Sequence, residues 1–464
     1  MSSLPRSTPE AQGLSTAALD SFVAALDASE QEIQTLTLVR HGHVVLAEEW
    51  APYRLADRHM LFSVSKSFTS MAIGLLVAAG QVSLDDQVIS FFGPDELPET
   101  ISDNLAAMKV RHLLTMTTGH SQDTVERLSR DRRMVGIFLG LDVEVEPGTL
   151  FVYNSGATYM LSAILQKVTG ETLLDYLRPR LFEPLGATEA IWDVSREGIT
   201  TGGWGLSLTT DSLAKFGQLM LQRGEWEGKQ LIPADWVDAA TSKQVPNDNE
   251  TNPDWQCGYG LQYWRARHGA YRADGAFGQY VVMFPDQDAT LAITSASPDM
   301  QATLDLVWAH LLPAFEGGKG DGTPRPQRLE ILPPKGAVPT GNGRTYTFEP
   351  NHSMLAAVRL DDDGTGTFTF SHAAGLWGNP SEASQEVVCA PGDWRELTDK
   401  LTDPPSRMVT SAHADGDAFV ATFRYLESPF AVTMTCRVDG DTMTIDGRNN
   451  VGFGPAEFTL RSVT

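Results

Sequence analysis

The sequence predicts a mixed α/β (α+β) protein, in which an all-helical lobe is inserted into an antiparallel sheet and a C-terminal antiparallel β domain follows. Strand-like segments lie on both sides of a mainly helical block that extends from about residue 67 to 190. A stretch rich in Gly and Pro and without periodicity, 316–336, then interrupts the chain. Beyond it, segments of alternating polarity are separated by Asp-Gly turns. We therefore expect a first domain at 1–315, a linker at 316–336 and a β-sheet or barrel domain at 337–464.

The N-terminal part of the chain predicts a helix followed by a β-hairpin. Residues 14–29 begin with Ser15, a favourable helix cap, and carry apolar side chains with the spacing of one helix face. The segment "TLTLVRHGHVVLAEEW" alternates in polarity and turns at Gly42, which predicts two paired strands. His41 and His43 flank this glycine, but a metal site needs a third ligand and none lies nearby in the sequence. We interpret both histidines as turn residues.

Periodicity also identifies the inserted lobe and the strands that follow it. Helical patterns occur in "SFTSMAIGLLVAAG", "VRHLLTMTTG", "ATYMLSAILQKVTG" and "TLLDYLRPRLFEPLG". Strand patterns return in "CGYGLQYW", "AFGQYVVMFP" and "ATLAITSA", and "MQATLDLVWAHLLPAF" predicts a closing helix. In the C-terminal part, acidic turns at 361–363, 415–417 and 439–441 lack the spaced ligands of a calcium loop, so we interpret them as hairpin turns.

Composition disfavours several classes of partner. The 464 residues carry 59 Asp and Glu against 35 Lys and Arg, and this net charge of −24 opposes binding to nucleic acid or to an anionic membrane. No apolar stretch approaches the ~20 residues of a membrane span, and the N-terminus lacks the basic and apolar regions of a secretory signal. Three scattered cysteines, Cys257, Cys389 and Cys436, fit free thiols in core or strand positions. We expect a cytoplasmic protein, and the sequence does not indicate its oligomeric state.

The segment "LFSVSKSFTS", residues 61–70, carries the main chemical signal. Ser63 and Lys66 lie three residues apart, so on a helix they share one face. A helix that starts near Ser63 places its hydroxyl at the positive end of the helix dipole, beside unpaired backbone N–H groups. Small and apolar residues line the helix that follows, so Lys66 is expected to be buried, which lowers its pKa and lets it accept a proton. This arrangement activates a serine nucleophile without a histidine.

A second Ser-x-x-Lys segment, Ser212–Lys215, provides an internal comparison. Leu213, Phe216 and Leu219 form the apolar stripe of the helix in which it lies. Ser212 falls in the capping turn, and Lys215 is expected to lie off the stripe, towards solvent. The second segment therefore predicts an ordinary capped helix rather than a catalytic pair.

Further segments resemble the landmarks of a known family, in the same order along the chain. They are "FSVSKSFTS", "VRHLLTMTTGH", "FVYNSGATYMLSAILQKVTG", "GGWGLSLTTDSLAKFGQLML" and "ADGAFGQYVVMFP". Over residues 8–312 the chain resembles the serine β-lactamase and penicillin-recognising enzyme superfamily. Within it, the chain is most similar to the branch of class C β-lactamases, carboxylesterases, D-amino-acid-specific peptidases and nylon-oligomer hydrolases. The resemblance implies a serine β-lactamase-like fold and acyl transfer through Ser63, without metal or cofactor.

The resemblance also implies roles for a second motif, Tyr-x-Asn, which matches Tyr153-Asn154-Ser155. Tyr153 would relay the Ser63 proton as a general base and acid, and a hydrogen bond to a charged lysine would depress its pKa. Ser155 replaces the asparagine of the family, so an amide contact to a substrate carbonyl is lost. Asn154 and Ser155 remain candidates for substrate binding, but the departure weakens the case for β-lactam or peptide substrates.

The third motif of the family, the strand triad Lys-Thr-Gly, is matched by Ala273-Asp274-Gly275. Substrate would lie against this strand at Asp274 and Gly275, and the N–H groups of Ser63 and Ala276 would form the oxyanion hole. The family's cation is missing at Ala273, and Arg272 could replace it only if the strand bulges, because adjacent strand residues point to opposite faces. Five aromatic residues are candidate pocket walls: Trp204, Tyr259, Tyr263, Trp264 and Phe277.

Together these features predict a serine hydrolase that forms an acyl-enzyme, most simply an esterase or amidase acting on small uncharged acyl compounds. Two alternatives stay open. One is a β-lactamase or D-aminopeptidase acting on a lactam or peptide. The other is a non-catalytic binding protein that retains the fold. The expected partner is a small ester, amide or lactam.

Overall fold

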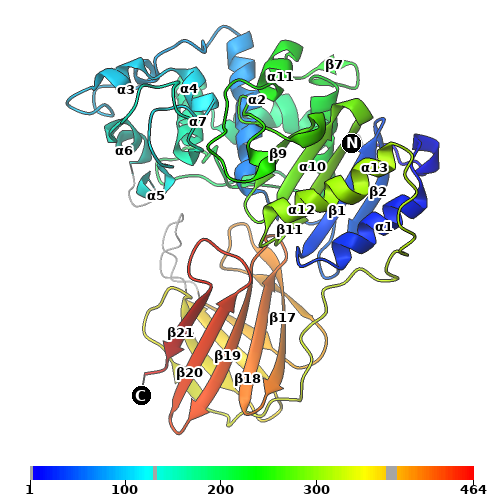
Figure 1. The fold of residues 1–464 in the computed structure, drawn as a ribbon. Coiled ribbons are helices and arrows are strands. Elements are labelled where there is room, and N and C mark those ends of the chain that lie inside the picture. The colour runs from blue at the N-terminus through cyan, green and yellow to red at the C-terminus, as the bar shows by residue number, and fades with distance from the viewer. Residues whose placement is uncertain (1–3, 129–132, 372–383, 464) are drawn as a thin grey trace. The chain divides into compact units, whose positions relative to one another are not determined.

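The computed structural model describes residues 4–128, 133–371 and 384–463, and the chain forms two compact units (Figure 1). The first unit contains Met1–Glu48, Arg58–Ser295 and Asp299–Gln327. The second contains Glu49–Asp57, Ala296–Pro298 and Arg328–Thr464. Two short segments that precede Arg328 in the sequence, Glu49–Asp57 and Ala296–Pro298, therefore belong to the unit that the C-terminal part builds.

A six-stranded antiparallel sheet forms the centre of the first unit. Its strand order is β2-β1-β11-β10-β9-β8. The strands are β1 (Ile33–Arg40), β2 (His43–Glu49), β8 (Trp264–Arg265), β9 (Tyr271–Gly275), β10 (Gln279–Phe284) and β11 (Ala289–Ser295). His41 and Gly42 make the turn between β1 and β2 with positive φ angles, as predicted for the hairpin. Within the described ranges, no group of three or more His, Cys, Asp or Glu side chains could hold a metal ion.

Helices cover both faces of this sheet. The helix α10 (Thr210–Leu221) packs closely on one face, because a Cβ atom at Gly217 would lie only 2.8 Å from Val281 Cγ2. On the other face, Tyr280 donates a hydrogen bond of 2.8 Å to the carbonyl of Met300 in α12 (Met300–Leu306). Successive side chains of a strand point to opposite faces, which explains why neighbouring residues of β10 meet different helices. Figure 1 shows α1 (Thr16–Asp27) and α13 (Leu312–Phe315) running along the same side as α12.

A lobe of helices is inserted between β2 and the later strands of the sheet. The central helix is α2 (Ser65–Ala78), which packs against α7 (Ser155–Thr169), α8 (Leu173–Leu177) and α11 (Ala234–Thr241). Its apolar and small residues are buried on nearly every side. The other helices of the lobe are α3 (Asp103–Ala107), α4 (Val110–Leu114), α5 (Val125–Leu128), α6 (Met134–Gly140) and α9 (Glu183–Leu185). Beside it lies a small sheet of β3 (His59–Met60), β5 (Leu206–Leu208) and β4 (Ile191–Trp192).

The second unit contains two antiparallel sheets around one apolar core. The smaller consists of β12 (Thr345–Thr347), β13 (Leu355–Leu360), β14 (Gly366–Ser371) and β15 (Ser384–Cys389). The larger consists of β16 (Arg395–Asp399), β17 (Ser406–Asp415), β18 (Ala418–Tyr425), β19 (Ala431–Asp439), β20 (Thr442–Asn449) and β21 (Glu457–Arg461). The acidic turns fall between paired strands, as predicted. The α/β fold class with a C-terminal antiparallel β domain is confirmed.

Three local expectations need correction. Ser15 stands at the cap position of α1, but its side chain makes no capping bond, and Glu10 Oε1 instead accepts the N–H of Thr16 at 2.9 Å. Lys215 is buried rather than solvated, because Asp211, one turn earlier, pairs with its ammonium at 2.8 Å. Cys257 is a half-buried loop residue, whereas the other two free cysteines are buried on strands. None of the helices in the described ranges is long and apolar enough to cross a membrane.

The segment Glu49–Asp57 is held by residues of the second unit. Arg54 Nη2 lies 2.9 Å from Glu396 Oε2, and the guanidinium of Arg407 pairs with Asp57. Tyr53 is only 2% exposed, and Arg424 Nη1 donates a 3.1 Å hydrogen bond to its hydroxyl. The segment therefore takes its stability from the C-terminal part of the chain.

Shortening the chain to end at Gln327 is expected to destabilise what remains, because Tyr53 loses its buried surroundings. Exposing a buried aromatic side chain costs about 2–3 kcal/mol. Urea unfolding, followed by tryptophan fluorescence, would measure the loss against the full chain. A Tyr53→Ala variant of the full chain is the control and should lose a comparable free energy. A shortened chain as stable as the full chain would contradict the prediction.

Candidate active site

Ser63 and Lys66 meet at the start of the central helix. Ser63 lies in the short 3-10 helix η2 (Phe62–Val64), which runs directly into α2. Lys66 Nζ lies 2.9 Å from Ser63 Oγ and 2.7 Å from the carbonyl oxygen of Gly203. Lys66 is 1% exposed, whereas Ser63 is partly exposed. The amine is therefore fixed beside the hydroxyl of a partly exposed serine.

The surroundings of Lys66 favour loss of its proton. Burial lowers the pKa of the Lys66 amine to about 8, although the negative charges of Asp123 and Asp274 oppose the shift. A lysine that titrates near pH 8 carries an appreciable neutral fraction under mildly alkaline conditions. The neutral amine can accept a proton from the adjacent hydroxyl, which is the requirement for a general base.

Tyr153 lies against the same pair, but its pKa differs from the expectation. Lys66 Nζ lies over the ring of Tyr153, 4.8 Å from its centre. Burial raises the pKa of Tyr153 well above its usual range, Asp274 raises it further, and a hydrogen bond with Ser63 lowers it only in part. The expected depression is wrong because the amine lies over the ring face and burial penalises a phenolate. Tyr153 is therefore a neutral phenol that can donate a proton.

Aromatic rings support Tyr153 from behind. Trp264 stacks on Tyr153 with 5.2 Å between ring centres and 24° between planes, and Tyr259 meets it edge-on at 6.3 Å. Both supporting residues are nearly fully buried, so they hold Tyr153 rather than line an open pocket. Tyr263 is fully buried, and its hydroxyl lies 3.5 Å from Met220 Sδ, so it is a core residue and not a pocket wall.

The end of β9 approaches the backbone that leads into Ser63. A Cβ atom at Gly275 would lie 2.1 Å from the carbonyl oxygen of Leu61, so only glycine permits this contact. The rings of Phe62 and Phe277 meet edge to face, 5.5 Å apart. These contacts bring Ala276, which is partly exposed, near Ser63. Phe62 and Phe277 both have positive φ angles, 48° and 64°, which are unfavourable for bulky residues.

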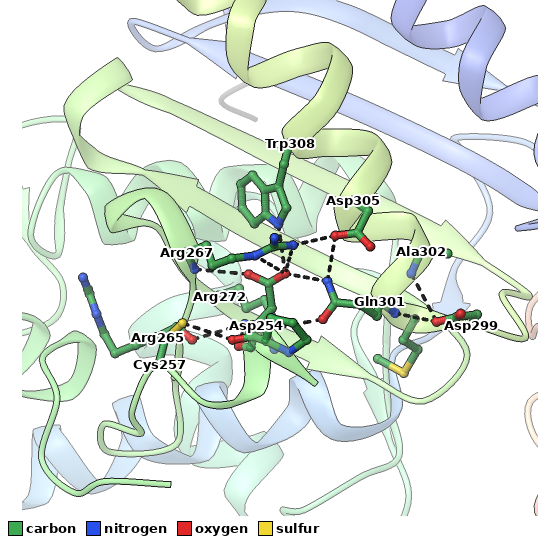
Figure 2. Close-up of polar contacts among 12 residues, drawn as sticks. Asp254, Cys257, Arg265, Arg267, Arg272, Asp299, Gln301, Ala302, Asp305 and Trp308 are labelled. Atoms are coloured by element: carbon green, nitrogen blue, oxygen red, sulfur yellow. Dashed lines mark hydrogen bonds and ion pairs between the residues drawn. The ribbon is translucent and has the colours of Figure 1, made fainter. Parts of the chain in front are cut away.

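Arg272 is held in an internal ion pair instead of facing the site as a free cation. The strand β9 pairs with β10 without a bulge, so Arg272 and Asp274 share one face, and Arg272 Nε lies 3.0 Å from Asp274 Oδ2. Arg272 Nη1 also donates a 2.8 Å bond to the carbonyl of Asp254 (Figure 2). Burial alone would raise the pKa of Asp254, but bonds from neighbours including Arg267 and Gln301 outweigh it and lower that pKa to about 2. A buried network therefore fixes the Arg272 side chain.

The structure does not place Asn154 where a substrate could contact it. Asn154 is fully buried at the cap of α7, where its Oδ1 accepts the N–H of Gly156 at 3.1 Å and the hydroxyl of Thr124 at 2.8 Å. The expectation that it binds substrate is therefore corrected to a capping role. Ser155, the next residue, is partly exposed, and its N–H is bound by Asp123 Oδ1 at 2.9 Å.

Replacing Asn154 with alanine is expected to lower the free energy of unfolding by about 2–3 kcal/mol, because a helix cap and buried hydrogen bonds are lost together. Urea unfolding would measure it, with Ser155→Ala as the matched control at the adjacent position. A loss no larger than that of the control would contradict the capping role.

Two contributors to the site were not singled out by sequence. Gly203 supplies the carbonyl that holds Lys66, and a Cβ atom there would lie 2.7 Å from the carbonyl oxygen of Ser155. Asp123 binds the start of α7 and places a negative charge near Lys66. The run "TGGWG" was the available signal, because adjacent glycines indicate close backbone approach. Trp204 in this run is partly exposed and stacks on Tyr159 with 6.4 Å between ring centres.

Comparisons with known proteins identify a family and several related hydrolases. The family described as Beta-lactamase matches residues 19–312. The 6-aminohexanoate-dimer hydrolase of Paenarthrobacter ureafaciens is 27% identical over 309 residues, covering 61% of this chain and 78% of that protein. Esterase EstB of Burkholderia gladioli is 28% identical over 199 residues, covering 36% of this chain and 50% of that protein.

Among solved structures, the octameric penicillin-binding protein homologue from Pyrococcus abyssi has a similar fold, with a TM-score of 0.54 and 16% identity. The likeness covers 97% of this chain and 100% of that one, so it extends over both units. The family match covers more than half of the sequence, and the relatives are named hydrolases and esterases. The chain is therefore a serine hydrolase that belongs to the beta-lactamase family.

Proposed function

We propose that the protein is an esterase or amidase that acts on small acyl substrates through an acyl-enzyme on Ser63. The observation that carries the proposal is the buried Lys66 amine, 2.9 Å from the hydroxyl oxygen of the partly exposed Ser63. A lysine pKa of about 8 supports a role as general base under mildly alkaline conditions. Ser63 is partly exposed, as attack on a substrate carbonyl requires.

The proposed steps use only residues of this chain. Ser63 Oγ attacks the carbonyl carbon while Lys66 Nζ accepts its proton, and the oxyanion is bound by the N–H groups of Ser63 and Ala276. The tetrahedral intermediate collapses, and the leaving group receives a proton from the neutral phenol of Tyr153, which regains one from Lys66. Water then attacks the acyl-enzyme by the same proton path in reverse and restores Ser63.

The charges near Ser63 support a substrate without a carboxylate. Ala273 stands at the position of the family's cation, and the Arg272 guanidinium is paired with Asp274. Asp123 places a negative charge near Lys66, which would repel an anionic substrate. The names of the two relatives support amides and esters as the substrate class. A cytoplasmic location stays a prediction.

Hydrolysis of p-nitrophenyl acetate and nitrocefin, measured side by side, tests the substrate class. The proposal predicts a higher kcat/KM for p-nitrophenyl acetate, and faster turnover of nitrocefin would favour a β-lactamase instead. A fluorophosphonate probe tests the nucleophile independently of the substrate. Labelling of the intact protein no stronger than that of Ser63→Ala would contradict the enzyme mechanism.

A further inference from the structure

The turn that joins β9 to β10 has an unusual backbone. The N–H of Gly278 bonds the carbonyl of Gly275 at 3.2 Å, so Ala276 and Phe277 form the middle of the turn. Phe277 has a φ of 64° and Gly278 a φ of 86°. A phenylalanine with positive φ is a conformational outlier, which persists only where the surroundings determine it. The contacts of the turn should therefore show what holds it.

The buried side chains of Gln279 and Ser295 contact the carbonyl group of every turn residue between Gly275 and Gln279. Gln279 Nε2 donates to the carbonyls of Ala276 at 3.1 Å and Phe277 at 3.3 Å. Ser295 Oγ lies 2.9 Å from the Phe277 carbonyl and 2.8 Å from that of Gly278. Both side chains are 0% exposed.

Gln279 and Ser295 also hold each other. Gln279 Nε2 donates to the Ser295 carbonyl at 2.8 Å, and Gln279 Oε1 accepts the Ser295 N–H at 3.2 Å. The amide of Gln279 is thereby fixed by β11, at the centre of the sheet, and the turn is held from a rigid strand.

We propose that Gln279 and Ser295 are positioning residues that direct the N–H of Ala276 into the oxyanion hole. A peptide unit is planar and its N–H points opposite to its carbonyl. The Gly275 carbonyl points into the turn, towards the Gly278 N–H, so the Ala276 N–H must point out of it. The inference rests on the proposed function, because it assigns a role within that acyl-transfer site.

The strain at Phe277 explains why such a clamp is needed. Without bonds to its carbonyl groups, the turn can relax Phe277 to a negative φ, which rotates the neighbouring peptide units. Gly275 cannot shift to restore the direction of the Ala276 N–H, because its backbone already lies against the Leu61 carbonyl. A small rotation would misalign the Ala276 N–H while Ser63 and Lys66 stay in place.

Paired oxo and thiono esters test this role. A thiono ester carries sulfur in place of the carbonyl oxygen, and sulfur accepts hydrogen bonds weakly, so its hydrolysis gains little from an oxyanion hole. The variants are Ser295→Ala and Gln279→Met. Each is expected to lower kcat/KM for p-nitrophenyl acetate by about 10–100-fold, because an intact oxyanion donor contributes about 10²–10³-fold. The thiono analogue should lose less than about 3-fold, so the oxo/thiono ratio falls at least several-fold.

Thr294→Val is the matched control. Thr294 is the adjacent residue of β11, is equally buried, and its hydroxyl bonds Thr35 Oγ1 at 2.6 Å instead of the turn. This variant should keep the wild-type oxo/thiono ratio. If Ser295→Ala does not fold, Ser295→Cys carries the same test, since a thiol keeps the size but donates weakly.

The outcomes separate the inference from the proposed function. Equal losses on both esters, or an unchanged ratio, would overturn the positioning role and leave the proposed function intact. Wild-type protein that hydrolyses no oxo ester above the Ser63→Ala background would overturn the proposed function, and the inference with it. A selective loss on the oxo ester supports both.

Discussion

Replacing Ser63 with alanine is expected to lower kcat for p-nitrophenyl acetate by about 10⁴-fold or more, in line with removal of the nucleophile in other serine hydrolases. The substitution removes the attacking oxygen, and the remaining groups can only polarise a bound substrate. Turnover measured by p-nitrophenolate release, together with fluorophosphonate labelling, checks the expectation. Retention of more than a tenth of the activity would show that another group carries the reaction.

Ser212→Ala is the natural control, because Ser212 belongs to the second Ser-x-x-Lys segment. Its hydroxyl donates to Glu189 Oε1 at 2.6 Å, and Lys215 is paired with Asp211. Ser212 and Lys215 are therefore each bound to a separate carboxylate and not to one another. The variant should keep activity within a few-fold of wild type. A comparable loss at both serines would point to a folding defect.

Replacing Lys66 with methionine is expected to lower kcat by about 10³-fold or more, since the general base contributes about 10²–10⁴-fold and also orients Ser63. In wild type, kcat/KM should rise with pH through about 8, the pKa of Lys66, because only the neutral amine accepts a proton. The variant should lose this rise. A pH profile of the variant that still rises near 8 would assign the titration to another group.

The Lys66→Met variant should also be more stable than wild type at neutral pH. The pKa of Lys66 is about 8 in the folded protein and lies near its ordinary value of 10.5 in the unfolded chain. Between these values the unfolded chain binds more protons, so wild-type stability rises with pH, and below pH 8 the buried ammonium costs roughly 3 kcal/mol. Urea unfolding at pH 7 and pH 10 should therefore show an advantage of Lys66→Met that narrows at the higher pH. An advantage independent of pH would contradict the shifted pKa.

Local sequence patterns predicted the part of the site that lies within one short segment of the chain. Ser63 and Lys66 lie on consecutive turns of one short segment, so their spacing alone indicates contact. The carbonyl of Gly203 and the charge of Asp123 reach Lys66 only through the tertiary fold, and no local pattern indicates such a distant partner. Lys215 was placed in solvent because helix periodicity ignores the acidic partner one turn away.

The structure agrees with some of the residue roles that the family resemblance implies and differs from others. Tyr153 lies against Lys66 as implied, but its ionisation depends on burial, which a motif does not encode. Asn154 was grouped with its neighbours in the motif, yet the helix cap requires its side chain inside. The strand motif departs from the family in a more informative way. Ala273 lacks the family's cation, and the nearby Arg272 and Asp274 neutralise each other in an ion pair.

The chain crosses between its two units at Glu49, Arg58, Ala296, Asp299 and Arg328. A chimera that exchanges only the residues after Arg328 with those of a relative would leave Arg54, Tyr53 and Asp57 facing foreign side chains. Functional exchange would have to transfer Glu49–Asp57 and Ala296–Pro298 with the C-terminal part. Substitutions in the C-terminal part are therefore expected to require matching changes in Glu49–Asp57 and Ala296–Pro298, earlier in the chain.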